Sequence, residues 1–242
     1  MNNFITAPLL MAEEGFITRF MNQIDLNLIQ GDRWRLILSG LGVTFHVAIG
    51  AILLGATIGL LLALMRMSSV APLRWFANIY LAVIRGVPMA LQLMIWWFVI
   101  ISPNTGLSRE IAAILAFGIN SGAYSAEIYR SGILSVDKGQ TEAGRSVGLS
   151  SFQNFLYIVA PQALKNALPP ITNEFITLIK YTSIVGFIGL QDMTRASDLI
   201  RSRTFSPLVP YLTVAVIYFT IVMILTILFG ALEKRLRKSD NR

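Results

Sequence analysis

Residues 36–65 form an apolar run that carries no formally charged side chain. Folded as a helix, a run of this length extends roughly 45 Å, whereas the hydrocarbon core of a bilayer is about 30 Å thick. The run therefore predicts a transmembrane helix that tilts or protrudes. Gly55 and Gly59 form a GxxxG pattern within it, which permits close contact with another helix.

Four further apolar spans follow, so we predict an all-α membrane protein with five transmembrane helices. Their predicted ranges are about 75–102, 109–130, 170–190 and 208–232. The composition agrees, because 55% of the 242 residues are hydrophobic, which is too apolar for an ordinary soluble domain. The chain has no cysteine and a single histidine, His46, which excludes disulfides, cysteine-based sites and a multi-histidine metal cluster.

Basic residues gather at the ends of the apolar spans, which explains the formal net charge of +7 better than a nucleic-acid-binding face does. Their distribution places the C-terminus in the cytoplasm and the N-terminus outside. We predict an extracytoplasmic or interfacial segment at 1–35, either an amphipathic surface helix or a frayed terminus. A transmembrane domain at 36–232, with a cytoplasmic loop at 135–170, precedes a basic cytoplasmic tail at 233–242.

Charged residues inside the predicted spans indicate either a polar path or an internal ion pair. Arg85 lies in the second span, where Gly86 and Pro88 predict a break in the helix. A kink with Arg85 paired to an acidic neighbour is at least as strong an interpretation as substrate contact. Glu127 can pair with Arg85, with Arg130 or with a bound cation, and an ion pair inside the bundle is the favoured interpretation.

The loop at 135–170 is too polar for lipid, although apolar spans flank it. Asp137 followed by Gln140 predicts a capping box that opens a helix at about 138–147. Gly148 is placed to end that helix in the left-handed conformation. Polarity alone fits either an ordinary cytoplasmic loop or a docking surface.

A second helix is predicted in the same loop. Ser150 followed by Gln153 forms another capping box. Pro161 is expected to kink or stop this helix, and Pro169-Pro170 suit the first turn of the next one.

The order of residues in this loop resembles the EAA signature of ABC importer permeases. Glu142-Ala143-Gly144 is followed by Gly148 and then by Ile158-Val159-Ala160-Pro161. Gly144 stands where a second alanine is usual, and Ala160 where leucine is usual. In that family the loop is a coupling helix that docks into a groove on a cytoplasmic ATPase. The resemblance implies an ATPase-coupling role for Glu142, Ala143, Gly144, Gly148 and Pro161.

Further motifs along about residues 36–235 resemble the polar amino acid (histidine, glutamine, arginine) branch of these permeases. They are Arg85-Gly86-Val87-Pro88, Gly122–Arg130, Val136–Gln140, Leu168-Pro169-Pro170 and Leu178–Ser183. The resemblance implies the transmembrane domain of a type I ABC importer in a bacterial cytoplasmic (inner) membrane. It also implies a second permease chain, identical or homologous, two cytoplasmic ATP-binding subunits, and an extracytoplasmic binding protein that delivers amino acids.

The chain itself is not expected to be an enzyme or to bind a cofactor or a metal. It lacks the Gly-x-x-x-x-Gly-Lys-Ser/Thr loop that cradles ATP phosphates, so ATP and Mg are expected on the partner ATPase. A zwitterionic amino acid needs a donor for its carboxylate and an acceptor for its ammonium group, roles that suit Arg85 and Glu127. The predicted substrate path consists of Arg85, Asn120, Tyr124, Glu127, Lys180 and Ser183.

Other functions remain open at this point. The substrate of an ABC importer can be another small polar solute, such as an opine or an organosulfur compound. An ion-coupled secondary transporter would leave the loop at 135–170 unexplained. A structural or protein-translocation subunit would not need the polar path that Arg85 and Lys180 indicate.

Overall fold

The computed structural model describes residues 15–101 and 105–237, which form helices joined by short turns, with no β-strand among them. The α-helices are α2 (Phe16–Ile24), α3 (Trp34–Met67), α4 (Ala71–Gly86), α5 (Met89–Ile95), α6 (Arg109–Leu134), α7 (Lys138–Ser146), α8 (Ser151–Asn154), α9 (Ala160–Tyr181), α10 (Met193–Thr204) and α11 (Leu208–Arg237). The predicted all-α class is confirmed. Residues 1–14 of the predicted N-terminal segment and 238–242 of the basic tail lie outside the described residues.

Three described helices, α3, α6 and α11, are long and apolar enough to cross a membrane. A fourth candidate consists of α4 and the helical run at Met89–Ile101, whose axes meet at 104°. The described residues thus offer three spans, or four if the bent pair counts as one. The predicted fourth span overlaps the second half of α9, which is not among these candidates, so the count of five stays a prediction.

The centre of the fold is the packing of α3 against α6, where glycines let the two backbones approach. A Cβ atom added at Gly55 would lie 2.7 Å from the Cβ of Ser121, and one added at Gly59 would lie 2.4 Å from the Cβ of Ser125. Real carbon atoms do not approach this closely, so only glycine fits at either position. The GxxxG pattern therefore marks a helix contact, as the sequence predicts.

Gly59→Ala is expected to destabilise the chain by about 1–3 kcal/mol, the usual cost of overpacking. For a chain of this size, each kcal/mol lowers the melting temperature by about 2–4 °C. Thermal unfolding of the purified protein in detergent measures the shift. Gly42→Ala on the same helix is the control, because its added Cβ would meet no atom within 4 Å. Equal melting temperatures for the two variants would contradict the tight contact.

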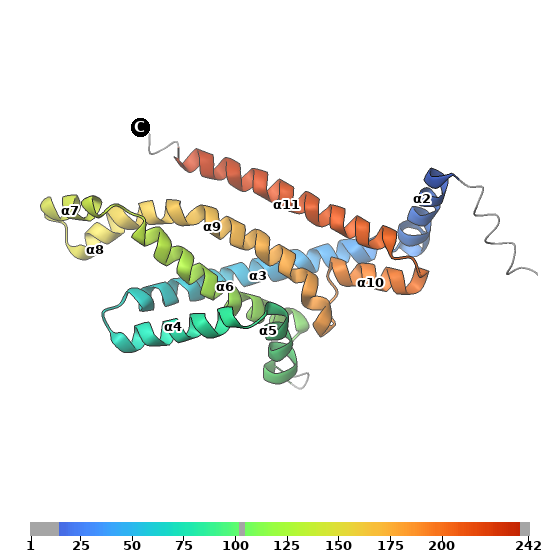
Figure 1. The fold of residues 1–242 in the computed structure, drawn as a ribbon, viewed down its shortest axis with the longest axis horizontal. Helices are drawn as coiled ribbons and strands as arrows, with labels where there is room; N and C mark the ends of the chain where they lie inside the picture. The colour runs from blue at the N-terminus through green and yellow to red at the C-terminus, as the bar shows by residue number, and fades with distance from the viewer. Residues whose placement is uncertain (1–14, 102–104, 238–242) are drawn as a thin grey trace, which may run out of the picture.

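The second predicted span is broken where the sequence indicates. Helix α4 ends at Gly86, and α5 begins at Met89 after Val87 and Pro88. Proline has no backbone N–H and its ring clashes with the preceding turn, so α4 does not continue through it. Figure 1 shows α5 turning sharply away from the line of α4.

The first helix of the polar loop begins and ends as predicted. The Asp137 side chain caps α7 by accepting a hydrogen bond from the Gly139 amide at 2.7 Å. Gly148 has a φ of +87°, and this left-handed residue follows the helix as a C-terminal stop. The capping box with Gln140 is wrong, because the Gln140 side chain instead accepts a bond of 3.4 Å from Gln162.

Helix α8 opens with the predicted capping box between Ser150 and Gln153, but the prolines do not divide the segment after it. The chain passes from α8 through a π-helical turn, Phe155–Val159, directly into α9. Pro161 lies in the first turn of α9, directly after this π-helical turn, and does not stop the helix. Pro169 and Pro170 lie inside α9 rather than at a helix start, so that prediction was wrong.

Tight packing against α6 explains how α9 persists through its two prolines. A Cβ added at Gly132 of α6 would lie 2.8 Å from the carbonyl oxygen of Ala163 and 3.1 Å from the Cβ of Ala167. Tertiary contacts of this kind override the local preference to break the helix.

The two ends of the bundle carry different elements (Figure 1). Helices α7 and α8, the turn between α3 and α4 and the last turns of α11 lie at one end, whereas α2 and α10 lie at the other. Helix α2 exposes Ile17 and Met21, by 76% and 58%. An amphipathic helix therefore exists in the N-terminal segment, while its place on a membrane surface stays a prediction.

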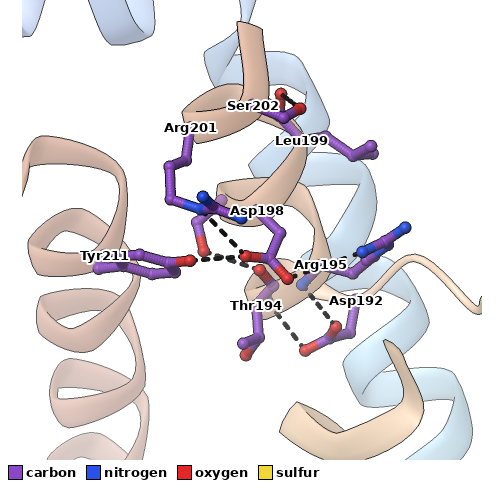
Figure 2. Close-up of polar contacts among 9 residues, drawn as sticks. Asp192, Thr194, Arg195, Asp198, Leu199, Arg201, Ser202 and Tyr211 are labelled. Atoms are coloured by element: carbon purple, nitrogen blue, oxygen red, sulfur yellow. Dashed lines mark hydrogen bonds and ion pairs between the residues drawn. The ribbon is translucent and has the colours of Figure 1, made fainter. Parts of the chain in front are cut away.

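The charged segment at 191–207 contains α10, and its side chains are tied together (Figure 2). The fully buried Asp192 caps α10 by accepting hydrogen bonds from the amides of Thr194 and Arg195, both at 2.9 Å. Asp198 contacts Arg195 and Arg201 at 3.7 and 3.5 Å and accepts a hydrogen bond from the Tyr211 hydroxyl of α11. One carboxylate thus offsets part of the positive charge and joins α10 to α11.

Candidate functional site at the helix break and coupling helix

Two adjoining cavities of about 340 and 440 Å³ open at the break between α4 and α5. They share Arg85, Gly86 and Tyr124 as lining residues. Asn120 lines the first cavity and Glu127 lines the second. The fold thus gathers four of the six predicted path residues on one polar surface, although they come from α4 and α6.

Arg85 at the end of α4 points its guanidinium group over the ring of Tyr124, with 5.4 Å between the guanidinium carbon and the ring centroid. The guanidinium forms no ion pair with an acidic residue in the described part of the chain, so neither the predicted structural pair nor a pair with Glu127 is observed. Stacking on a ring leaves the N–H donors free. Arg85 therefore presents a planar donor group that suits a carboxylate.

Glu127 is held instead by two other arginines. Its carboxylate contacts the Arg66 guanidinium of α3 and lies 2.7 Å from Nη2 of Arg130, one turn further along α6. The Nε of Arg66 also donates a hydrogen bond of 3.0 Å to Asn78 of α4. The interpretation of Glu127 as part of an ion pair inside the bundle is confirmed, and this network joins α3, α4 and α6.

Gln92 shapes the break, although no pattern in the sequence singles it out. Its side chain is buried and donates hydrogen bonds of 2.7 Å to the carbonyl oxygens of both Ile84 and Val87. Its own amide oxygen accepts a bond of 3.3 Å from Asn120. Gln92 thus satisfies backbone carbonyls that the broken helix leaves open and fixes Asn120 against the break.

Two predicted path residues lie elsewhere. Lys180 is exposed, and the Ser183 hydroxyl donates to the carbonyl oxygen of Lys180 at 2.7 Å. Neither residue lines either cavity at the break. Lys180 lies in the last turn of α9, and Ser183 lies in the 3-10 turn Thr182–Ile188 that continues the helix.

Glu174 of α9 is an acidic residue that lies close to the first cavity. Glu174 lies near Tyr181, which lines that cavity, although Glu174 itself lines neither cavity at the break. The buried Ser121 hydroxyl lies beside Glu174. The signal in the sequence was an acidic residue inside an apolar span, which marks a functional candidate in a membrane protein.

The predicted coupling residues lie on and after α7. Glu142 and Ala143 are exposed, Gly144 is buried, Gly148 follows the helix, and Pro161 is exposed in the first turn of α9. Large apolar side chains surround them at the same end of the molecule and are open to solvent; they are Val147 at 78%, Phe152 at 72% and Tyr157 at 67% exposure. An exposed apolar patch with charged neighbours is typical of a protein-binding surface.

The described residues contain no group of three or more histidine, aspartate or glutamate side chains that could hold a metal ion. His46 lies 3.0 Å from the Glu110 carboxylate.

Comparison with known proteins identifies the family to which the chain is similar. The family described as "Binding-protein-dependent transport system inner membrane component" matches residues 52–238. The L-cystine transport system permease protein TcyB of Bacillus subtilis (strain 168) is 36% identical over 88% of this chain and 92% of its own length. The arginine transport system permease protein ArtQ of the same organism is 37% identical over 84% and 94%. The putative glutamine transport system permease protein GlnP of Rickettsia typhi (strain ATCC VR-144 / Wilmington) is 36% identical over 83% and 92%.

Solved structures agree with these relatives. An amino acid ABC transporter crystallised with histidines has a chain that superposes with a TM-score of 0.79 and 36% identity, over 92% of this chain and 99% of that one. A chain of the inward-facing methionine ABC transporter MetNI gives a TM-score of 0.68 at 20% identity, over 84% and 94%, which supports the fold alone.

Proposed function

The chain belongs to the family of binding-protein-dependent transport system inner membrane components, and we propose that it conducts polar amino acids as the permease of an ATP-driven importer. The relatives named for cystine, arginine and glutamine support amino acids as the substrate class. The observation that carries the proposal is the unpaired Arg85 guanidinium in the cavity at the helix break.

Arg85 would bind the carboxylate of a passing amino acid through two parallel hydrogen bonds. Asn120 and Tyr124 would add polar contacts from α6. Because the Glu127 carboxylate already forms ion pairs with Arg66 and Arg130, Glu174 is the better acceptor for the substrate ammonium group. In this proposal Glu127 holds the surrounding helices in place rather than touching the substrate.

The sequence motifs and the family support the proposed arrangement of the other subunits of the importer. Two cytoplasmic ATPases, which hold ATP and Mg, would dock at α7, and a second permease chain, identical or homologous, would complete the pore. An extracytoplasmic binding protein would deliver the amino acid at the opposite end. In this proposal, α7, α8 and the basic tail at 233–242 lie in the cytoplasm, the segment at 1–35 lies outside, and the domain at 36–232 lies in the cytoplasmic membrane.

Transport by the purified complex tests this function. We expect proteoliposomes that contain both permease chains, the ATPases and the native binding protein to accumulate a radiolabelled amino acid only with ATP. Competition among L-arginine, L-glutamine, L-histidine and L-cystine identifies the substrate. Uptake that persists without ATP and stops when ion gradients collapse would contradict the proposal, and so would competition only by solutes that are not amino acids.

A further inference from the structure

Asn154 links α7 to the long helical segment that follows it. It is the last residue of α8 and is only 2% exposed. Its amide nitrogen donates a hydrogen bond of 2.8 Å to the carbonyl oxygen of Thr141, in the middle of α7. Its amide oxygen is buried and has no hydrogen-bond partner among the described residues.

Gly144 faces this side chain from α7. A Cβ atom added there would lie 2.3 Å from Oδ1 of Asn154 and 2.7 Å from Cδ1 of Ile158. Gly144 is also one of the two positions at which the chain departs from the EAA signature, and alanine is usual there. The structure gives a physical reason for the departure: the Asn154 amide occupies the space that an alanine methyl group would need.

Packing on this side of α7 is incomplete. A cavity of about 310 Å³ lies behind it, lined by residues that include Thr141, Arg145 and Asn154. A second hydrogen bond from the following segment to α7, from Gln162 to Gln140, is exposed and long, at 3.4 Å. A helix with a cavity beside it depends more on a buried hydrogen bond.

We infer that Gly144 and Asn154 form an interlocked pair that sets the position of α7 relative to α9, with Asn154 as a positioning residue for energy coupling. The inference rests on the proposed function, because α7 is taken to be the site at which the ATPase docks. An alanine at 144 must push Asn154 off its bond to Thr141 or push α7 away from α8. An alanine at 154 removes the bond and leaves a gap beside Gly144.

The amount of amino acid transported per ATP hydrolysed measures coupling in proteoliposomes that contain the full complex and the binding protein. We expect Gly144→Ala and Asn154→Ala each to lower this ratio at least about threefold, because the first crowds the contact and the second removes a buried hydrogen bond and leaves a gap. The double variant is expected to recover at least about half of the wild-type ratio, because the new methyl group fills the space that the amide leaves. Such recovery is non-additive, as expected for residues in contact.

Gly42→Ala is the matched control, because it adds a methyl group to open space and should keep the wild-type ratio. If a single variant no longer co-purifies with the ATPase, the amount of ATPase bound to the tagged chain replaces the ratio as the readout. A double variant that binds the ATPase again then supports the interlock equally. A wild-type ratio in Gly144→Ala, or a double variant no better than that single variant, would overturn the inference. A wild-type complex without ATP-dependent amino acid uptake would instead overturn the proposed function.

Discussion

Arg85→Ala lowers amino acid uptake by at least about 30-fold while the complex still assembles; this is the largest effect that we expect. Arg85 is exposed in the chain alone, and its proposed pair with the substrate carboxylate would be enclosed only in the assembled pore. There, truncating one partner of a buried, hydrogen-bonded charge pair costs roughly 2–5 kcal/mol, and 2 kcal/mol corresponds to about 30-fold. Without a substrate, Arg85 contacts only the ring of Tyr124 among the charged and aromatic groups described here, so its loss removes little from the fold. Initial uptake rates and co-purification of the ATPase measure the two effects separately.

Arg109→Ala is a matched control for this prediction. Its guanidinium carbon lies 5.3 Å from the ring centroid of Trp97, nearly the same stacking geometry as that of Arg85 on Tyr124, but Arg109 lines neither cavity at the helix break. We expect this variant to transport at close to the wild-type rate. If Arg85→Ala fails to assemble with its partners, Arg85 has a structural role and the substrate assignment is wrong.

Glu142→Lys is expected to reduce recovery of the ATPase with the tagged chain at least about tenfold. Glu142 is exposed on α7, beside the apolar side chains that surround the coupling residues. Charge reversal inside a protein interface places like charges together or leaves a partner charge unpaired, which costs several kcal/mol. Affinity purification from native membranes in mild detergent, followed by identification of the bound proteins, gives the measurement.

Asp25→Lys provides the charge-matched control. Asp25 is also an exposed acidic residue, but it follows α2, at the end of the bundle opposite α7 (Figure 1). This variant should retain the ATPase in full. If wild type brings down no ATP-binding protein under conditions that preserve other complexes, α7 is not a coupling helix, and an ion-coupled transporter becomes the better explanation.

Features that depend on neighbours in sequence were predictable. The cap at Asp137, the stop at Gly148 and the capping box at Ser150 involve residues only a few positions apart, so the sequence contains all the information. The break at Pro88 is equally local. The prediction that Pro169 and Pro170 begin a new helix was wrong, because packing of α9 against α6 outweighs their tendency to end a helix.

Pairings between helices were not predictable in the same way. Nothing near Glu127 indicates that Arg66, 61 residues earlier, returns to meet it, because this depends on how the turn between α3 and α4 places the two helices. Gln92 was missed for a related reason: its hydrogen bonds matter only once the helix is broken at 104°. Sequence reasoning nevertheless found four residues that line the two cavities, since Arg85, Asn120, Tyr124 and Glu127 are polar residues in apolar surroundings.

In the proposed importer, the continuous helical run from Ser151 to Tyr181 would act as a lever. At 1.5 Å per residue it is about 45 Å long, with Asn154 near one end and Glu174 and Tyr181 near the other. A tilt of only about 5° would move the far end by about 4 Å, comparable to the size of an amino acid's charged groups. A small displacement of α7 would therefore suffice to change which side chains face the helix break, if the π-helical turn at Phe155–Val159 is rigid.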